Sequence, residues 1–214
     1  MGVGGSQHVG ERLAALPLWE EDQRFCELRT LIGGYTILDH QRLYILYQVA
    51  IDTESVAGDL AEAGVYRGGS ALLLSKVSGK RLHLFDTFCG LPTPDEADVH
   101  REGDFADTSD KDVAQLLGKR DVVFYAGLFA TTFRLAEDQR FSLVHIDVDL
   151  YESTQQCLDF FYPRVSEGGV MVFDDYGFIS CPGARRAVDE FFTTKRERPI
   201  YLPTGQAVVI RRGL

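Results

Sequence analysis

Hydrophobic and polar residues along the chain follow two different patterns. Residues 19–32 and 38–51 carry apolar side chains at the spacing of a helix, such as Leu43 and Leu46 in the second segment. From residue 59 onward, short apolar runs rich in β-branched residues alternate with helical stretches. This order predicts two N-terminal helices followed by an α/β unit whose buried strands are mostly parallel.

The expected strands are short apolar segments bounded by turn residues. They span residues 59–65, 81–87, 122–127, 142–149 and 169–175, with a closing pair at 200–203 and 206–212. The expected helices between them span residues 69–77, 111–118, 152–165 and 183–194. We therefore expect a Rossmann-like α/β fold, in which a mostly parallel seven-stranded sheet has helices on both faces.

The chain is predicted to form one domain. Its 214 residues, of which 45% are hydrophobic, suit a single α/β core, and no repeat or low-complexity linker divides residues 1–214. Within that domain we expect residues 1–18 to be flexible and residues 19–52 to form helices that cover the site. Residues 59–212 should then form the Rossmann-like core.

Composition and charge limit the partners. A net charge of −10 argues against nucleic acid and against anionic membrane surfaces. The four cysteines are widely spaced without a CxxC pair, which is typical of reduced thiols. Neither a signal peptide nor an apolar run of membrane-spanning length is visible, so a cytoplasmic location is expected. A homodimer or higher homo-oligomer is expected from how common such assemblies are.

The first two expected strands end in features that suit a nucleoside. The first leads into a glycine-rich turn at residues 62–70 (EAGVYRGGS), where glycine lets the backbone approach a ligand and a helix start offers free N–H groups. The second ends at Asp86, whose carboxylate can accept both hydroxyls of a ribose. Each feature alone is also compatible with a tight connection or a turn aspartate.

The glycine spacing argues against NAD as the nucleoside ligand. A dinucleotide site uses G-x-G-x-x-G so that the pyrophosphate can lie on the backbone, whereas this turn has G-x-x-x-G-G. Glu62 would also repel a diphosphate. It suits the cationic amino-acid portion of S-adenosylmethionine better, either directly or through the loop that it orders.

The last two buried strands end in acidic residues. Residues 145–149 read His-Ile-Asp-Val-Asp, and residues 173–176 read Phe-Asp-Asp-Tyr. If these strands are neighbours, four carboxylates converge and repel one another, a conflict that a divalent cation removes. Oxygen ligands alone favour Mg²⁺, Mn²⁺ or Ca²⁺ over zinc. The alternative is that Asp174 and Asp175 cap the next helix.

Alternation along the fourth strand would place His145, Asp147 and Asp149 on one face, with His145 deepest. His145 then either supports a metal ligand or is a hydrogen-bonded core residue, which is the commoner role. An alcohol is a poor nucleophile, and its activation needs a metal to lower its pKa and a carboxylate to take its proton. Asp149 is the candidate base.

Several of these segments together resemble the macrocin-type O-methyltransferases, the TylF/MycF family. The resemblance covers about residues 35–195 and is carried by EAGVYRGGS (62–70), FDTFCGLP (85–92), AGLFATT (126–132), HIDVDLYEST (145–154), GGVMVFDDY (168–176) and CPGARRAVDEF (181–191). It implies a class I methyltransferase fold, S-adenosylmethionine and Mg²⁺ or Mn²⁺. It further implies that the acceptor is a sugar hydroxyl, often on a glycosylated natural product. Because the N-terminal region is short and leaves less protein to enclose the acceptor, we expect a small saccharide or the exposed sugar of a glycoside.

The resemblance also implies roles for particular residues. Asp147, Asp174 and Asp175 would be the metal ligands, and Asp149 would be the general base. The residues that would contact the cofactor are Thr36, Ile37, Glu62, Ala63, Gly64, Val65, Tyr66, Ser70, Asp86, Thr87, Phe88, Leu128 and Asp147. Apart from the resemblance, four aromatic residues near the predicted rim are candidates either to stack on a sugar or simply to pack in the fold: Phe88, Tyr151, Tyr176 and Phe178.

Two other functions remain to be weighed. A catechol- or caffeoyl-type O-methyltransferase shares the aspartates but places a lysine base three residues after the first ligand, where this chain has Leu150. A non-catalytic module that only binds S-adenosylmethionine would have no need for four converging carboxylates.

Overall fold

The N-terminal helices are separated by aspartate caps. The computed structural model describes residues 17–213, so the expectation of a flexible start lies, up to residue 16, outside the described residues. The single helix expected at 19–32 is two helices, α1 (Leu18–Glu21) and α2 (Gln23–Ile32). Asp22 interrupts them because its carboxylate accepts the Phe25 N–H at 2.9 Å and so caps α2. Asp39 caps α3 (His40–Asp52) in the same way.

Seven strands form one sheet, as the sequence predicted. The parallel strands are β1 (Asp59–Ala63), β2 (Leu82–Asp86), β3 (Val122–Ala126), β4 (Phe141–Ile146) and β5 (Val165–Phe173). β6 (Ile200–Tyr201) and β7 (Ala207–Ile210) form an antiparallel pair, with β7 also antiparallel to β5. The strand order is β3-β2-β1-β4-β5-β7-β6, so the direction of winding reverses between β1 and β4.

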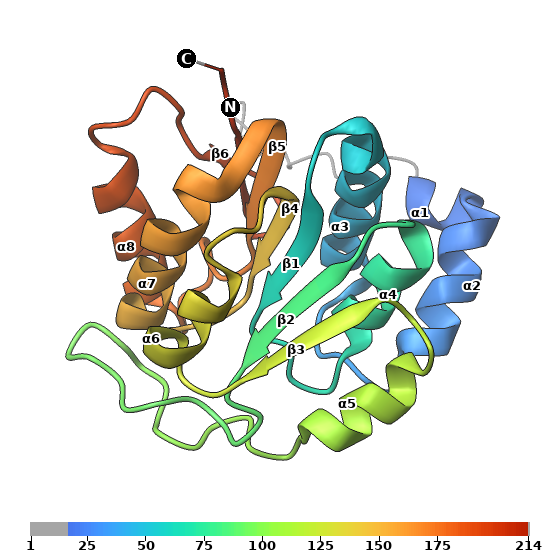
Figure 1. Ribbon diagram of the computed structural model, residues 1–214, viewed down its shortest axis with the longest axis horizontal. Helices are drawn as coiled ribbons and strands as arrows, with labels where there is room; N and C mark the ends of the chain where they lie inside the picture. Colours follow the sequence, from blue (N-terminus) through green and yellow to red (C-terminus); the bar gives the residue numbers. More distant parts are fainter. Residues whose placement is uncertain (1–16, 214) are drawn as a thin grey trace, which may run out of the picture.

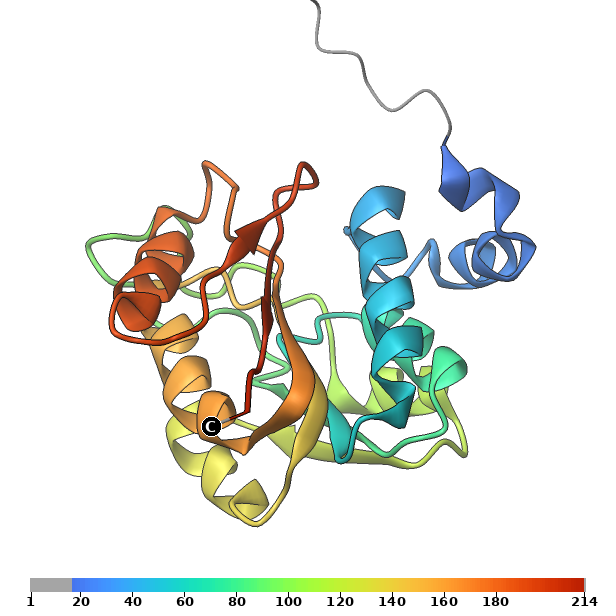
Figure 2. The ribbon, with the colours of Figure 1, turned by 90° about the horizontal axis from the view of Figure 1, so that it is seen from above.

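Helices cover both faces of this sheet, as the sequence predicted. The remaining helices are α4 (Gly69–Val77), α5 (Asp110–Leu117), α6 (Phe129–Thr132), α7 (Tyr151–Phe161) and α8 (Pro182–Phe192). Short 3₁₀ segments lie at Thr53–Ser55, Phe133–Ala136 and Tyr162–Arg164. Helices α1 to α5 lie on one side of the sheet and α6 to α8 on the other, so the two groups flank the strands to the right and to the left in Figure 1. Figure 2 shows the same division from above.

Alternating strand residues divide the core into two layers. Leu60, Leu84 and Leu143 pack on the side of α2 to α5, whereas their neighbours along each strand pack against α6 to α8. Aromatic rings fill the second layer, where Phe85 stacks on Tyr125 with ring centroids 4.3 Å apart. Because both layers are apolar, the strands hold their register firmly and present fixed ends to solvent.

Some boundaries differ from the prediction. The fourth strand ends at Ile146 instead of residue 149, because Asp149 turns the chain with a positive φ of 59°. The alternation that would place Asp149 on the face of His145 therefore stops before it. The fifth strand begins at Val165, four residues earlier than expected, and α6 was not predicted. In residues 17–213, no helix has the length and apolar character needed to span a bilayer.

Gly64 holds the ends of β1 and β4 in close contact. It has a φ of +82°, and a Cβ atom on it would lie 1.7 Å from the carbonyl oxygen of Asp147. Across the same junction, the Asp147 N–H donates to the Ala63 carbonyl at 2.9 Å. The backbone of Asp147 can therefore lie this close to the end of β1 only because Gly64 has no side chain.

We predict that Gly64→Ala destabilises the fold by about 3 kcal/mol or more, because backbone strain and overlap with Asp147 add together. Gly103→Ala is the matched control, since Gly103 has a φ of +84° but has no atom within 4 Å of an added Cβ. Its cost should be about 1 kcal/mol, from backbone strain alone. Urea unfolding of both variants measures the difference. Equal losses would contradict the importance of the Gly64–Asp147 contact.

Candidate active site

One large cavity lies at the carboxyl ends of the parallel strands. It has a volume of about 480 Å³ and is lined by the loops that follow β1, β2, β3, β4 and β5. The segment before α3 and the long loop between β2 and α5, green in Figure 1, complete its walls. The cavity spans the point between β1 and β4 where winding reverses, which is where ligands of open α/β sheets bind.

Asp86 organises the wall nearest β1 and β2. One carboxylate oxygen accepts the N–H groups of Val65 and Tyr66 at 2.6 and 3.0 Å. The other accepts the Phe88 N–H at 2.8 Å. The carboxylate thus fixes the glycine-rich turn against the end of β2 while it also lines the cavity. Asp86 can therefore hold the turn and still bind a ligand in the cavity.

Most of the predicted cofactor residues line the cavity. They are Thr36, Ile37, Gly64, Val65, Tyr66, Ser70, Asp86, Thr87, Leu128 and Asp147. Glu62, Ala63 and Phe88 are not among the lining residues, and the first two have no exposed surface. Glu62 instead pairs with His145, whose Nδ1 lies 2.8 Å from its Oε1. Any effect of Glu62 on a ligand must therefore pass through the turn that follows it.

Backbone strain is concentrated around the cavity. In the part of the chain that the structure describes, the non-glycine residues with positive φ are Tyr66, Phe88, Phe105 and Asp149. Three of them, Tyr66, Phe105 and Asp149, line the cavity. Such conformations persist only where the surroundings enforce them, and they cluster at functional sites.

Acidic side chains converge at the other wall of the cavity. Asp147, Asp174 and Asp175 each offer a carboxylate oxygen, and these oxygens lie within 4.8 Å of one another. Asp175 Oδ2 accepts the N–H groups of Val148 and Asp149 at 3.0 and 2.9 Å, which pulls the turn after β4 toward β5. The two strands are neighbours, so the predicted convergence is present.

Burial and mutual repulsion raise the pKa values of part of this cluster. Both effects raise the pKa of Asp147 well above its usual range and that of Asp175 to about 6. Burial alone would also raise the pKa of Asp174, but contacts with His145, Arg42 and Gln206 lower it. A cation placed among these oxygens would relieve the repulsion, so the three aspartates fit a divalent metal with oxygen ligands.

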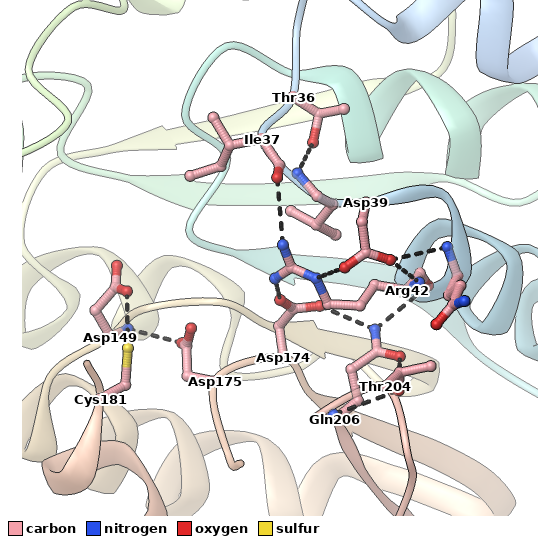
Figure 3. A network of polar contacts seen from close by, with 12 residues as sticks. Thr36, Ile37, Asp39, Arg42, Asp149, Asp174, Asp175, Cys181, Thr204 and Gln206 are labelled. Atoms are coloured by element: carbon pink, nitrogen blue, oxygen red, sulfur yellow. Dashed lines mark hydrogen bonds and ion pairs between the residues drawn. The ribbon is translucent and has the colours of Figure 1, made fainter. Parts of the chain in front are cut away.

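Arg42 joins the acidic cluster to the segment before α3, as Figure 3 shows. Its guanidinium pairs with Asp174 Oδ2, donates to Asp39 Oδ2 at 3.0 Å and donates to the Ile37 carbonyl at 3.2 Å. The same group lies over the ring of Phe178, 4.8 Å from its centroid. Arg42 therefore fixes the cavity wall at Ile37 to the buried end of β5.

Both oxygens of Asp174 are engaged by neighbours. Besides Arg42, Gln206 donates to Oδ1 at 2.9 Å, and His145 Nε2 lies 3.5 Å from the same oxygen. His145 is fully buried, and its contacts with Asp174 and Glu62 raise its pKa to about 10 against the effect of burial. It thus lies directly behind a candidate metal ligand and is also a hydrogen-bonded core residue, so its position fits both of its expected roles.

Asp149 lies on the cavity side of the cluster. Its Oδ1 is 3.3 Å from Cys181 Sγ, which donates to it, and 3.5 Å from His100 Nε2. The exposed fraction of its side chain is 17%. Burial and the neighbouring Asp175 raise its pKa to about 8. The position is accessible from the cavity.

Several residues at the site were not predicted. Arg42 had a sequence signature, because it lies on the i, i+4 line of Leu46 and Ala50 on the buried face of α3. Gln206 and His100 come from a hairpin and a long loop with no such pattern. Of the predicted rim aromatics, only Phe178 lines the cavity. The Tyr151 hydroxyl instead donates to Glu190, and the Tyr176 hydroxyl to Asp189, so both rings belong to the α7–α8 side.

Comparison with known proteins identifies the family. The family model described as macrocin-O-methyltransferase (TylF) matches residues 14–209. The chain belongs to this family. The family and the fold predicted from the sequence are thereby confirmed.

Two relatives and one solved structure give the measure of similarity. Demethyldecarbamoylnovobiocin O-methyltransferase from Streptomyces niveus is 31% identical, over 74% of this chain and 68% of its own length. The 8-demethyl-8-(2,3-dimethoxy-alpha-L-rhamnosyl)-tetracenomycin-C 4'-O-methyltransferase from Streptomyces olivaceus is 31% identical, over 71% of this chain and 66% of its own. The solved O-methyltransferase NovP is 29% identical, with a TM-score of 0.75 over 84% of this chain and 83% of NovP. The chain thus spans about two thirds of the curated relatives' length.

Membership of the macrocin O-methyltransferase family supports S-adenosylmethionine as the cofactor. We predict that Asp86→Ala weakens its binding at least tenfold, about 1.4 kcal/mol, because the expected acceptor for the ribose hydroxyls would be lost together with the anchor of residues 65–66. Asp121→Ala is the control, since Asp121 is an exposed carboxylate whose partner, Arg81, lies outside the cavity lining. Isothermal titration compares the two, and unchanged affinity in Asp86→Ala would remove this residue from the site.

Proposed function

We propose that this chain is a metal-dependent O-methyltransferase that transfers a methyl group from S-adenosylmethionine to a sugar hydroxyl. One observation carries the proposal. A single cavity in the fold of this family has a nucleoside-type wall at Asp86 and a carboxylate wall at Asp147, Asp149 and Asp175. A donor held at the first wall would face an acceptor held at the second. The metal would be Mg²⁺ or Mn²⁺.

The proposed division of labour follows from the contacts of each wall. Asp86 and the turn that it fixes would bind the adenosine portion, while Thr36 and Ile37 would cover it from the side of α3. Arg42 holds Ile37 in place through its carbonyl. These residues would orient the donor and exclude water from it, which accounts for much of the rate of a transfer between two bound molecules.

Asp147, Asp174 and Asp175 would hold the metal. When bound, it would supply positive charge that lowers the pKa of an acceptor hydroxyl and fixes the position of its oxygen. Arg42 and Gln206 hold the buried carboxylate of Asp174, and the N–H groups of Val148 and Asp149 hold that of Asp175. The protein thus keeps two of the three ligands in place by hydrogen bonds of its own.

Asp149 would take the proton of the acceptor hydroxyl. It lies on the cavity wall, outside the three-aspartate group, and its conformation is set by the N–H that it donates to Asp175. A carboxylate in this position can accept a proton without giving up a metal ligand.

The acceptor is proposed to be a small saccharide or the sugar of a glycoside. The name of the Streptomyces olivaceus relative specifies the 4' position of a rhamnosyl group. Phe105 and Phe178 line the cavity, where their rings would contact the apolar side of a sugar. Leu150 argues against a phenolic acceptor, because it is buried where a catechol-type enzyme has its lysine base. We also propose a cytoplasmic location and a homo-oligomeric assembly.

Removal of the metal should abolish transfer. With labelled S-adenosylmethionine and a panel of rhamnosides, other glycosides and catechols, we expect methylation of sugars in Mg²⁺ and its loss in EDTA. Asp175→Asn should abolish turnover and weaken Mn²⁺ binding measured by electron paramagnetic resonance. The variant should still unfold cooperatively on heating, which shows that the fold survives. Full activity in chelator would show that the aspartates are structural, and methylation of catechols alone would favour the phenolic alternative.

Loss of the base should slow the chemical step alone. We predict that Asp149→Asn lowers the single-turnover rate by about 10² to 10⁴ while cofactor and Mn²⁺ affinities stay close to those of the wild type. Asparagine tolerates a positive φ, so the backbone at this position is preserved. Glu152→Gln, the same change at an exposed cavity residue, is the control and should react at the normal rate. A wild-type rate in Asp149→Asn would assign the proton to another group.

A further inference from the structure

A second group of possible metal ligands lies beside the proposed base. His100 lies in the loop between β2 and α5, Asp149 lies in the turn after β4, and Cys181 directly precedes α8. Their nearest atoms form a triangle with sides of 3.6 Å from Sγ to Nε2, 3.3 Å from Sγ to Oδ1 and 3.5 Å from Nε2 to Oδ1. All three residues line the cavity.

The dimensions of this triangle match those of a tetrahedral zinc site. Zinc bonds of about 2.0–2.1 Å to nitrogen, 2.0–2.2 Å to oxygen and 2.3 Å to sulfur, at tetrahedral angles, separate the ligand atoms by about 3.3 to 3.6 Å. One ion placed at the centre of the three atoms therefore needs little movement of the protein. The fourth position would face the cavity.

The histidine is oriented as metal-binding histidines are. Its Nδ1 lies 3.4 Å from Asp104 Oδ2, which also accepts the Arg101 N–H at 2.9 Å. A carboxylate behind Nδ1 favours the tautomer with its proton on that nitrogen, so that Nε2 presents a lone pair to the triangle. This arrangement of carboxylate and histidine is the usual support of a zinc ligand.

The loop that carries His100 is fastened to the far wall of the cavity. Asp98 Oδ1 accepts the N–H of Tyr151, the first residue of α7, at 2.9 Å. The loop is therefore held near α7 and α8 before any ion binds, and His100 and Cys181 do not have to be brought together from a distance. A ligand set that is already assembled binds an ion more tightly, because little ordering remains to oppose binding.

We propose that His100, Asp149 and Cys181 form a zinc site separate from the Asp147, Asp174 and Asp175 group. A sulfur, a nitrogen and an oxygen suit zinc, whereas Mg²⁺ requires oxygen ligands. On binding, the Cys181 thiol gives its proton to solvent and its sulfur joins the ion as thiolate.

Zinc at this site is inhibitory, a consequence that rests on the proposed function. The ion occupies the Asp149 oxygen that would accept the proton of the acceptor hydroxyl. It also ties the His100 loop to the start of α8 across the acceptor side of the cavity. Zinc therefore stops methyl transfer even while Mg²⁺ saturates its own site.

Cobalt substitution tests the site without reference to activity. Metal-free protein titrated with Co²⁺ in excess Mg²⁺ should develop a cobalt–thiolate charge-transfer band at one ion per chain. The band should be absent in Cys181→Ser and in His100→Ala. It should be intact in Cys89→Ser, which removes an exposed thiol from the loop that carries His100. Asp104→Asn should weaken cobalt binding about 10- to 100-fold, because the support behind His100 is lost. Circular dichroism verifies that each variant is folded.

The outcomes separate this proposal from the proposed function. A band that is missing in the wild type, retained in Cys181→Ser or abolished by Mg²⁺ would overturn the zinc site. In the same preparation, zinc should inhibit methyl transfer by the wild type and Cys89→Ser, and undiminished transfer with the ion bound would refute its inhibitory role. A cobalt band without methylation of any acceptor would leave the zinc site standing and contradict the methyltransferase proposal.

Discussion

Repulsion among the carboxylates at the ends of β4 and β5 is the constraint on which the site depends. Asp147, Asp149, Asp174 and Asp175 come together because their strands are neighbours in a parallel sheet, and burial increases the cost of their charges. The protein offsets part of this cost by surrounding the aspartates with Arg42, Gln206, His145 and backbone N–H groups. What remains is a group of closely spaced carboxylate oxygens at the cavity, whose repulsion a divalent cation would relieve.

The same contacts connect the two halves of the cavity. Arg42 reaches from α3 to Asp174 and on its way holds the Ile37 carbonyl, which belongs to the wall expected to cover the cofactor. Asp86 performs a comparable task for the turn after β1, and Gly64 allows that turn to approach Asp147. Hydrogen bonds therefore connect the two walls, so that a shift of the acidic cluster would also move the residues proposed to bind the donor.

Residues at strand ends could be predicted from the sequence because their position follows from local pattern. Asp86, Asp147 and Asp175 each come at the end of an apolar run, and the cavity lies where those runs end. The extent of β4 was overestimated because the acidic residues after Ile146 continue its alternation, while the turn itself is made by the distant carboxylate of Asp175. Helix α6 was missed because four residues are too few to show a period. His100 and Gln206 could not be found because only tertiary packing brings them to the site.

The contact of Gln206 with the acidic cluster has a consequence for how the protein is made. Gln206 lies between β6 and β7, and it bonds both to Asp174 and to the carbonyl of Arg42, 164 residues earlier in the chain. Domains are synthesised from the N-terminus, and contacts between distant residues must await the arrival of the later one. Asp174 therefore stays without one of its hydrogen-bond donors until Gln206 has left the ribosome. A nascent chain that has formed every parallel strand still lacks a finished acidic cluster, so the hairpin of β6 and β7 completes both the sheet and this part of the cavity.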